Sequence, residues 1–281
     1  MSGWRPGPRA SQAVAFGLLW LGAAMVVLPV MGILLTMFIR GARSLSWELL
    51  SGVEEGLLPA IVGTTWLVVL TGVIAAPLGV AAAVYLSEYA RAGTLVRLIR
   101  LAIVNLAGVP SVVYGLFGLA LFVVLLHLGR CLLAGACTLA LLVLPLVITA
   151  SEEALRQVPR QLRDASFALG ATRWQTVRRV VLPNALPGIM TGLILSVGRA
   201  AGETAPILFT AAFYSLTDPF PNSVLDPIVA LPYQLFVMAT EVPGITEGTK
   251  WATSVVLVGL VLGLNLAAVV MRGRLRRGRR W

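Results

Sequence analysis

Two oppositely charged side chains, Arg199 and Glu203, lie in a stretch that is otherwise small and apolar. Residues four apart on an α-helix share a face, so we expect these two side chains to pair. Ionisable groups at membrane depth are costly unless they pair or face water, which makes them candidates for function. The planar guanidinium of an arginine can bind a tetrahedral oxyanion. A second role remains open, in which the ion pair only locks neighbouring helices together.

The sequence has no pattern of a catalytic site. It has no G-x-x-x-x-G-K-[ST] motif for nucleotide binding. The Gly-Thr-Lys stretch at 248–250 comes nearest, but it has no glycine at the earlier position that the motif requires. It also has no nucleophile elbow and no H-E-x-x-H motif, and we expect its one histidine, His127, to anchor a helix end. Cys131 and Cys137 are too few for a zinc site or a disulfide framework, although a bridge between them remains open. The sequence predicts a non-catalytic protein with no catalytic residue, metal or cofactor.

The most polar stretch of the chain, residues 151–184, lies between two apolar runs. It holds six arginines and three acids in a chain that is 58% hydrophobic. Pro159 is expected to separate two short helices. Gly170 is expected to end a helix, because only glycine adopts the left-handed backbone cheaply. One interpretation is a loop lying on the membrane surface, and the other is a helix–turn–helix that binds a partner.

The second half of this stretch has the signals of another short helix. Thr172 and Gln175 have the spacing of a capping box at its start. Pro183 and Pro187 are expected to end it where the next apolar run begins.

The spacing within 151–184 resembles the EAA loop of ABC-importer permeases. That family has Glu-Ala-Ala, three residues, Gly, nine residues, then Ile, any residue, Leu and Pro. Here Asp, Ser and Val replace Glu, the second Ala and Ile. The resemblance implies a coupling helix held in a groove of a cytoplasmic ATPase subunit. The residues that would couple the chain to the ATPase are Asp164, Ala165, Ser166, Gly170, Leu182 and Pro183.

Two further stretches, 109–118 and 198–206, are similar to the phosphate-specific permeases of that family, and the second indicates the A-type subunit. The resemblance extends over residues 61–271. It implies a pathway for phosphate whose candidate residues are Arg199, Glu203 and Ser111. It also implies the partners: a homologous permease subunit, two cytoplasmic ATPase subunits and an extracytoplasmic phosphate-binding protein. The alternatives are another oxyanion such as sulfate or molybdate, an ion-driven secondary transporter, or a membrane assembly factor.

The elements that must position these residues are membrane spans. Charged residues make up only 12% of the 281 residues, and the mean hydropathy is +0.90, as in a polytopic membrane protein. We therefore expect an all-α fold with six transmembrane helices, resembling the bundle of type I ABC-importer permeases. A span needs about 20 apolar residues, and the expected spans are 13–39, 61–86, 101–128, 132–150, 186–213 and 252–271.

The positions of the basic residues predict the orientation of these spans. With the N-terminus inside, 17 of the 22 arginines and lysines fall in cytoplasmic segments and four outside. We therefore expect both termini to be cytoplasmic in an inner (plasma) membrane protein. The net charge of +10 then reflects topology and attraction to membrane lipid, and nucleic acid is not an expected partner. The domain layout would be a tail, span and outer loop (1–60), a permease domain (61–271) and a basic tail (272–281).

Overall fold

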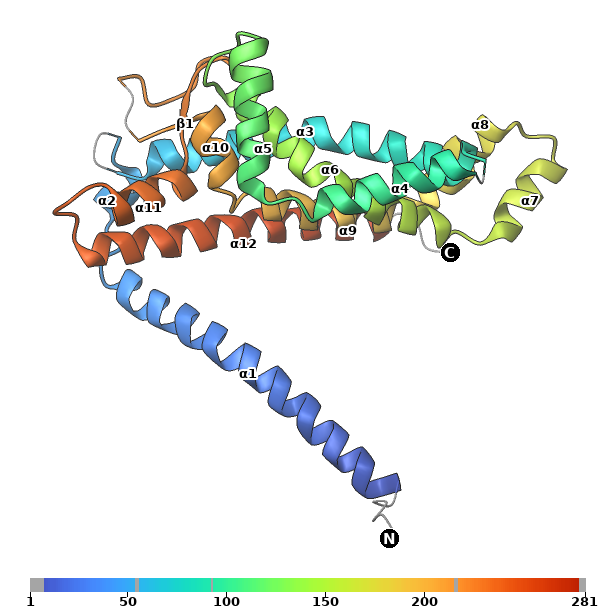
Figure 1. Cartoon of the computed structure of the whole chain (residues 1–281), viewed down its shortest axis with the longest axis horizontal. Helices are drawn as coiled ribbons and strands as arrows, with labels where there is room; N and C mark the ends of the chain where they lie inside the picture. Colours follow the sequence, from blue (N-terminus) through green and yellow to red (C-terminus); the bar gives the residue numbers. More distant parts are fainter. Residues whose placement is uncertain (1–7, 54–55, 92, 215–216, 278–281) are drawn as a thin grey trace.

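The computed structural model describes residues 8–53, 56–91, 93–214 and 217–277, and nearly all of its regular structure is helical (Figure 1). The first half contains α1 (Pro8–Ala42), α2 (Trp47–Ser51), α3 (Leu58–Val84), η1 (Tyr85–Tyr89), α4 (Thr94–Ala107), α5 (Ser111–Gly118) and η2 (Leu119–Leu125). The second half contains α6 (Leu132–Arg156), α7 (Arg160–Ala168), α8 (Arg173–Thr176), η3 (Val177–Val181), α9 (Leu182–Ala200), α10 (Ala205–Thr210), α11 (Leu231–Thr240) and α12 (Glu247–Arg277). The elements named η are π-helical turns.

The expected all-α membrane architecture is confirmed, with one small sheet that the sequence did not predict. Strands β1 (Ala212–Phe213) and β2 (Ile228–Val229) pair in parallel. In the described ranges, five helical segments are long and apolar enough to cross a membrane, and a bent pair makes up to six. The five are Ala15–Ala42, Leu58–Tyr89, Leu132–Arg156, Arg173–Ala200 and Glu247–Val270.

The third expected span, 101–128, is not one straight helix. The chain bends by 101° between α4 and the segment formed by α5 and η2. Pro110 causes the break, because it lacks the N–H that an α-helix needs at that position. The Tyr114 hydroxyl donates a hydrogen bond to the Leu106 carbonyl across the bend, at 2.9 Å, and so provides a partner near the end of α4.

The fifth expected span, 186–213, is shifted toward the N-terminus. Pro183 and Pro187 do not end the preceding helix: α8, η3 and α9 form one span, Arg173–Ala200. Pro183 lies in the first turn of α9, where the bonding pattern is already changing from π to α, so its missing N–H does not end the helix. The span ends at Ala200, and the short helix α10 follows after a turn.

Helix α6 is the centre of the packing, between α3 and α9 (Figure 1). Glycines let the backbones approach closely. A Cβ at Gly79 of α3 would lie 2.5 Å from Val147 of α6, and one at Gly192 of α9 would lie 2.4 Å from Ala150. These contacts explain why α6 is buried over much of its length.

Different elements lie at the two ends of the bundle (Figure 1). Figure 1 shows the start of α1, the end of α12 and the α7–α8 loop toward one end, and α2, α11 and β1 toward the other. Helix α1 leans away from the rest and meets α12, where the backbone of Trp251 lies close to Gly41.

Cys131 and Cys137 are both free thiols, so the bridge that the sequence left open is not formed.

Candidate coupling loop and ion-pair site

The loop between α6 and α9 folds as the sequence predicts. Pro159 precedes α7, and Gly170 ends it with a positive φ of 80°. Thr172 and Gln175 form a capping box at the start of α8, with the Thr172 N–H bonding the Gln175 side chain at 2.8 Å. The Ser166 and Thr176 hydroxyls hydrogen-bond at 2.9 Å and join the two short helices. Local signals therefore suffice to predict the helix–turn–helix.

The six predicted coupling residues separate into two groups. Asp164, Ala165 and Gly170 are exposed at the tip of the loop, with Ser166 half-buried between α7 and α8. Leu182 and Pro183 are half-buried at its root, in the first turn of α9.

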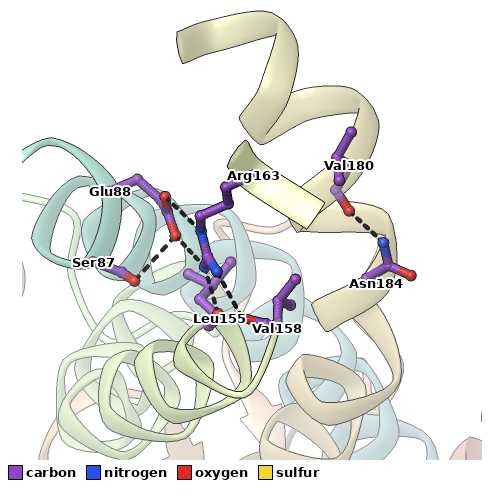
Figure 2. Close-up of polar contacts among 7 residues, drawn as sticks. All are labelled: Ser87, Glu88, Leu155, Val158, Arg163, Val180 and Asn184. Carbon is purple, nitrogen blue, oxygen red and sulfur yellow. Dashed lines mark hydrogen bonds and ion pairs between the residues drawn. The ribbon is translucent and has the colours of Figure 1, made fainter. Parts of the chain in front are cut away.

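The root continues the helix into the span. The Asn184 side-chain amide donates to the Val180 carbonyl at 2.7 Å (Figure 2), which supplies a donor where the helix changes from π to α. Leu182 packs against the buried cluster that joins α3, α6 and α9. The tip residues are therefore the more exposed group, and the root residues connect the tip to the span.

Large apolar side chains on the loop are exposed, which the sequence analysis missed. Leu169 is 89% exposed and Trp174 is 59% exposed, and Leu162 and Phe167 are also exposed. Exposed apolar side chains gathered on a polar segment are typical of a protein-binding surface. The signal that could have found them is the spacing of these residues around Gly170, outside any apolar run.

The loop is attached to the end of the α3 span by an ion pair that the sequence did not predict. Arg163 of α7 pairs with Glu88 of η1 at 2.8 Å (Figure 2). The two residues lie 75 positions apart, so no local spacing rule could connect them. Arg173 of α8 also lies over the ring of Tyr89, with its guanidinium carbon 5.4 Å from the ring centroid.

Arg199 and Glu203 do pair, although not on one helix face as predicted. Arg199 is the penultimate residue of α9. Glu203 lies in the turn that follows, where its backbone N–H donates to the Ala200 carbonyl at 3.2 Å. The Arg199 Nε lies 3.6 Å from the Glu203 Oε1. The Arg199 side chain is 49% exposed and the Glu203 side chain 17%. The guanidinium therefore stays open on one side.

The bend between α4 and α5 brings a second segment to this pair. Tyr114 lies in α5, which packs on α10, the short helix that begins two residues after Glu203. Gly115 packs on the start of α10, where an added Cβ would lie 2.9 Å from the Ala205 carbonyl oxygen. Ser111, the third predicted pathway residue, begins α5 at the bend, one helical turn before Tyr114. The sequence did not predict that Tyr114 would bond back to Leu106 across this bend.

Helix α9 packs against α12 next to this pair. A Cβ at Gly198 would lie 2.3 Å from the Asn265 side-chain oxygen, so an amide of α12 sits beside the residue that precedes Arg199. In the described ranges, no three His, Cys, Asp or Glu side chains gather as a metal site would require. The chemistry that this arrangement offers is hydrogen bonding and charge attraction for an anion.

A model of the family described as the binding-protein-dependent transport system inner membrane component matches residues 75–281. The matched part includes α6 to α12, with both the loop and the ion pair.

Curated relatives are similar over nearly the whole chain. A Bacillus subtilis protein named as a probable ABC transporter permease, YqgI, is 33% identical over 92% of this chain and 94% of its own length. The phosphate transport system permease protein PstA 1 of Mycobacterium tuberculosis is 35% identical over 97% of this chain and 91% of its own. PstA of Pasteurella multocida is 34% identical over 91% and 89%.

Solved structures share the fold. A chain of the MetNI methionine ABC transporter, in an inward-facing conformation, has a TM-score of 0.64 at 20% identity and covers 78% of this chain and 95% of its own. A chain of a bacterial ABC transporter that imports alginate has a TM-score of 0.64 at 14% identity, covering 95% and 99%. With its apolar helices, the protein is a multi-pass protein of the inner membrane, and it belongs to the family of binding-protein-dependent transport system inner membrane components.

Proposed function

We propose that the chain is the permease subunit of an ATP-driven phosphate importer and forms half of its translocation pathway. The observation that carries the proposal is the exposed apolar loop of α7 and α8, attached directly to membrane-spanning helices in a chain about 35% identical to named phosphate permeases. A surface of this kind suits a cytoplasmic partner that pushes on the spans. The ion-driven secondary transporter is not favoured, because the family match gives the membrane component of a binding-protein-dependent system.

The proposal divides the work among several chains. Two cytoplasmic ATPase subunits would hydrolyse ATP, and one of them would hold the tip residues Asp164, Ala165, Ser166 and Gly170 of this chain. A homologous permease subunit would complete the pathway, and an extracytoplasmic binding protein would deliver phosphate. The chain itself would be non-catalytic and would occupy the bilayer through a permease domain spanning 61–271.

Arg199 is the proposed contact for phosphate in transit. Its half-exposed guanidinium has donors that suit the tetrahedral anion. Glu203 holds the guanidinium in place and weakens its attraction, so that the anion can leave. Ser111 and Tyr114 would line the same part of the pathway, because α5 packs on α10, which begins two residues after Glu203.

Transport by the assembled complex tests the proposed substrate. In proteoliposomes that hold this chain with its partner subunits and binding protein, we expect ATP-dependent uptake of labelled phosphate. Excess unlabelled phosphate should suppress the uptake, whereas equal excesses of sulfate and molybdate should leave most of it. Competition by sulfate as strong as that by phosphate would show that the cargo is another oxyanion.

The orientation of the chain has a separate test. The basic residues predict that both termini and the 151–184 loop are cytoplasmic, and the start of α1, the end of α12 and the α7–α8 loop lie toward one end of the molecule (Figure 1). In a background with Cys131→Ser and Cys137→Ala, we expect an impermeant thiol reagent added to intact cells to label Asn222→Cys. The same reagent should not reach Gln161→Cys until the cells are opened. Both positions are exposed, so labelling of the second in intact cells would contradict this topology.

A further inference from the structure

Glu88 is a buried carboxylate that no part of the proposed pathway uses. It is 9% exposed and lies in η1, the π-helical turn at the end of the α3 span. The Ala90 N–H closes this turn by bonding the Tyr85 carbonyl at 2.8 Å. Turns of this kind are rare in helices and frequent at functional sites. A buried charge needs a partner, because leaving water is costly for it.

The partner, Arg163, is bound on several sides at once (Figure 2). Its Nη2 and Nε donate to the two Glu88 oxygens at 2.8 and 3.4 Å. Its Nη1 donates to the Val158 carbonyl at 2.6 Å, and its Nη2 also donates to the Leu155 carbonyl at 2.9 Å. Leu155 lies in the last turn of α6, where its carbonyl also accepts the Val158 N–H at 3.3 Å, and Val158 lies just beyond the helix. One guanidinium therefore joins three elements: α7, the end of α3 and the end of α6.

Helix α7 depends on this connection more than a packed helix would. None of its residues is buried, and it lies outside the apolar cluster that joins the ends of α3, α6 and α9. A hollow of about 290 Å³ lies beside it, lined by residues that include Val158, Leu162 and Asn184. The Ser166–Thr176 bond links α7 only to α8. Arg163 is therefore the side chain of α7 that bonds the ends of both α3 and α6, in addition to the chain link at 157–159 and the packing of α7 on α8 and η3.

We propose that Arg163 and Glu88 form a coupling clamp, which passes displacement of α7 to the α3 and α6 spans. The inference rests on the proposed docking of α7 to an ATPase subunit. Neither residue contacts phosphate or ATP, so both are positioning residues. Breaking the clamp would weaken the transfer of α7 displacement to the α3 and α6 spans, and ATP hydrolysis would continue with much less transport.

A nearby ion pair of the same type provides the matched control. Arg156 pairs with Glu152 at 2.6 Å, four residues apart within α6. Its side chain is 56% exposed, against 16% for Arg163. Glu152 keeps a second partner, Arg100 at 2.8 Å, when Arg156 is replaced. Arg156→Gln therefore removes an arginine from the same region without disconnecting α7.

The experiment measures phosphate moved per ATP hydrolysed, in proteoliposomes with the full transporter. We expect this ratio to fall about tenfold in Glu88→Gln and in Arg163→Gln, a change within the usual range of coupling mutations. ATP hydrolysis should stay within about twofold of the parent, and Arg156→Gln should keep the parent ratio. Arg163→Lys should give an intermediate ratio. The lysine ammonium keeps the positive charge, but it lacks the planar guanidinium that can bind both carboxylate oxygens and two carbonyls at once.

Other outcomes would overturn the clamp. If uptake and hydrolysis fall together, the pair only holds the fold, because a structural defect removes active complexes and leaves the ratio unchanged. If the ATPase subunit no longer co-purifies with either Gln variant, the pair is an assembly anchor rather than a transmitter. The parent protein tests the proposed function separately. If the parent lacks ATP-driven phosphate uptake, the proposed function is wrong. If the parent takes up phosphate and the variants keep its ratio of phosphate to ATP, only the clamp is disproved.

Discussion

Replacing Arg199 and Glu203 together by glutamine is expected to leave an assembled transporter whose phosphate uptake is about 10- to 100-fold lower. The estimate follows from the roughly 1.5–3 kcal/mol that hydrogen bonds to charged groups contribute. Assembly should survive, because replacing both partners by neutral amides leaves no unpaired charge at membrane depth, whereas removing one of them would. The measurement is uptake in proteoliposomes, with co-purification of the ATPase subunit as the check on assembly.

A second exposed ion pair provides the control for this variant. Glu247 and Lys250 pair at 2.9 Å at the start of α12, three residues apart. Their double replacement by glutamine removes the same kinds of charge away from the Arg199 region and should leave uptake near the parent value. If the Arg199/Glu203 variant also transports normally, the pair only locks the helices, which is the role that the sequence left open.

Gly170→Leu should abolish coupled transport with little effect on insertion of the protein. At a φ of 80°, a residue other than glycine costs roughly 1–2 kcal/mol of backbone energy. An added Cβ meets no atom of this chain within 4 Å, so the new side chain would project into the space that the ATPase subunit is proposed to fill. We expect co-purified ATPase to fall at least about tenfold, since one misfitting contact of 1.4 kcal/mol has this effect.

Gly129→Leu separates the backbone cost from the lost contact. Gly129 has a φ of 70° and equally open surroundings, but lies in the turn before α6, at the other end of that helix from the loop. It should bear the same backbone cost and keep the ATPase subunit. Equal losses in both variants would mean that Gly170 matters only for the shape of its own turn.

The sequence predicts the loop well because its signals are local. Pro159, Gly170 and the Thr172–Gln175 capping box each act within a few residues, and the structure has all three features. Five of the six expected spans likewise follow from long apolar runs that the structure keeps as single helical segments, although the fifth is shifted in sequence.

The errors have two different causes. Pro110 and Pro183 are the same residue type in apolar surroundings, yet the first breaks a helix and the second does not. The backbone around them differs: the Tyr114–Leu106 bond closes the bend at the first, and a π-turn precedes the second. The Arg163–Glu88 pair was missed because of long-range packing, since only the folded chain brings α7 to the end of α3.

The 101° bend also bears on how the protein enters the membrane during synthesis. Helix α4 has 14 residues, and α5 and η2 have eight and seven. At about 1.5 Å per residue, neither arm reaches across the roughly 30 Å hydrocarbon layer. The arm that contains α4 also carries Arg97 and Arg100, which oppose partitioning into lipid. The insertion machinery would therefore hold or release this segment according to its neighbours, and its final position would be set only after α6 and α10, which pack against α5, have been made.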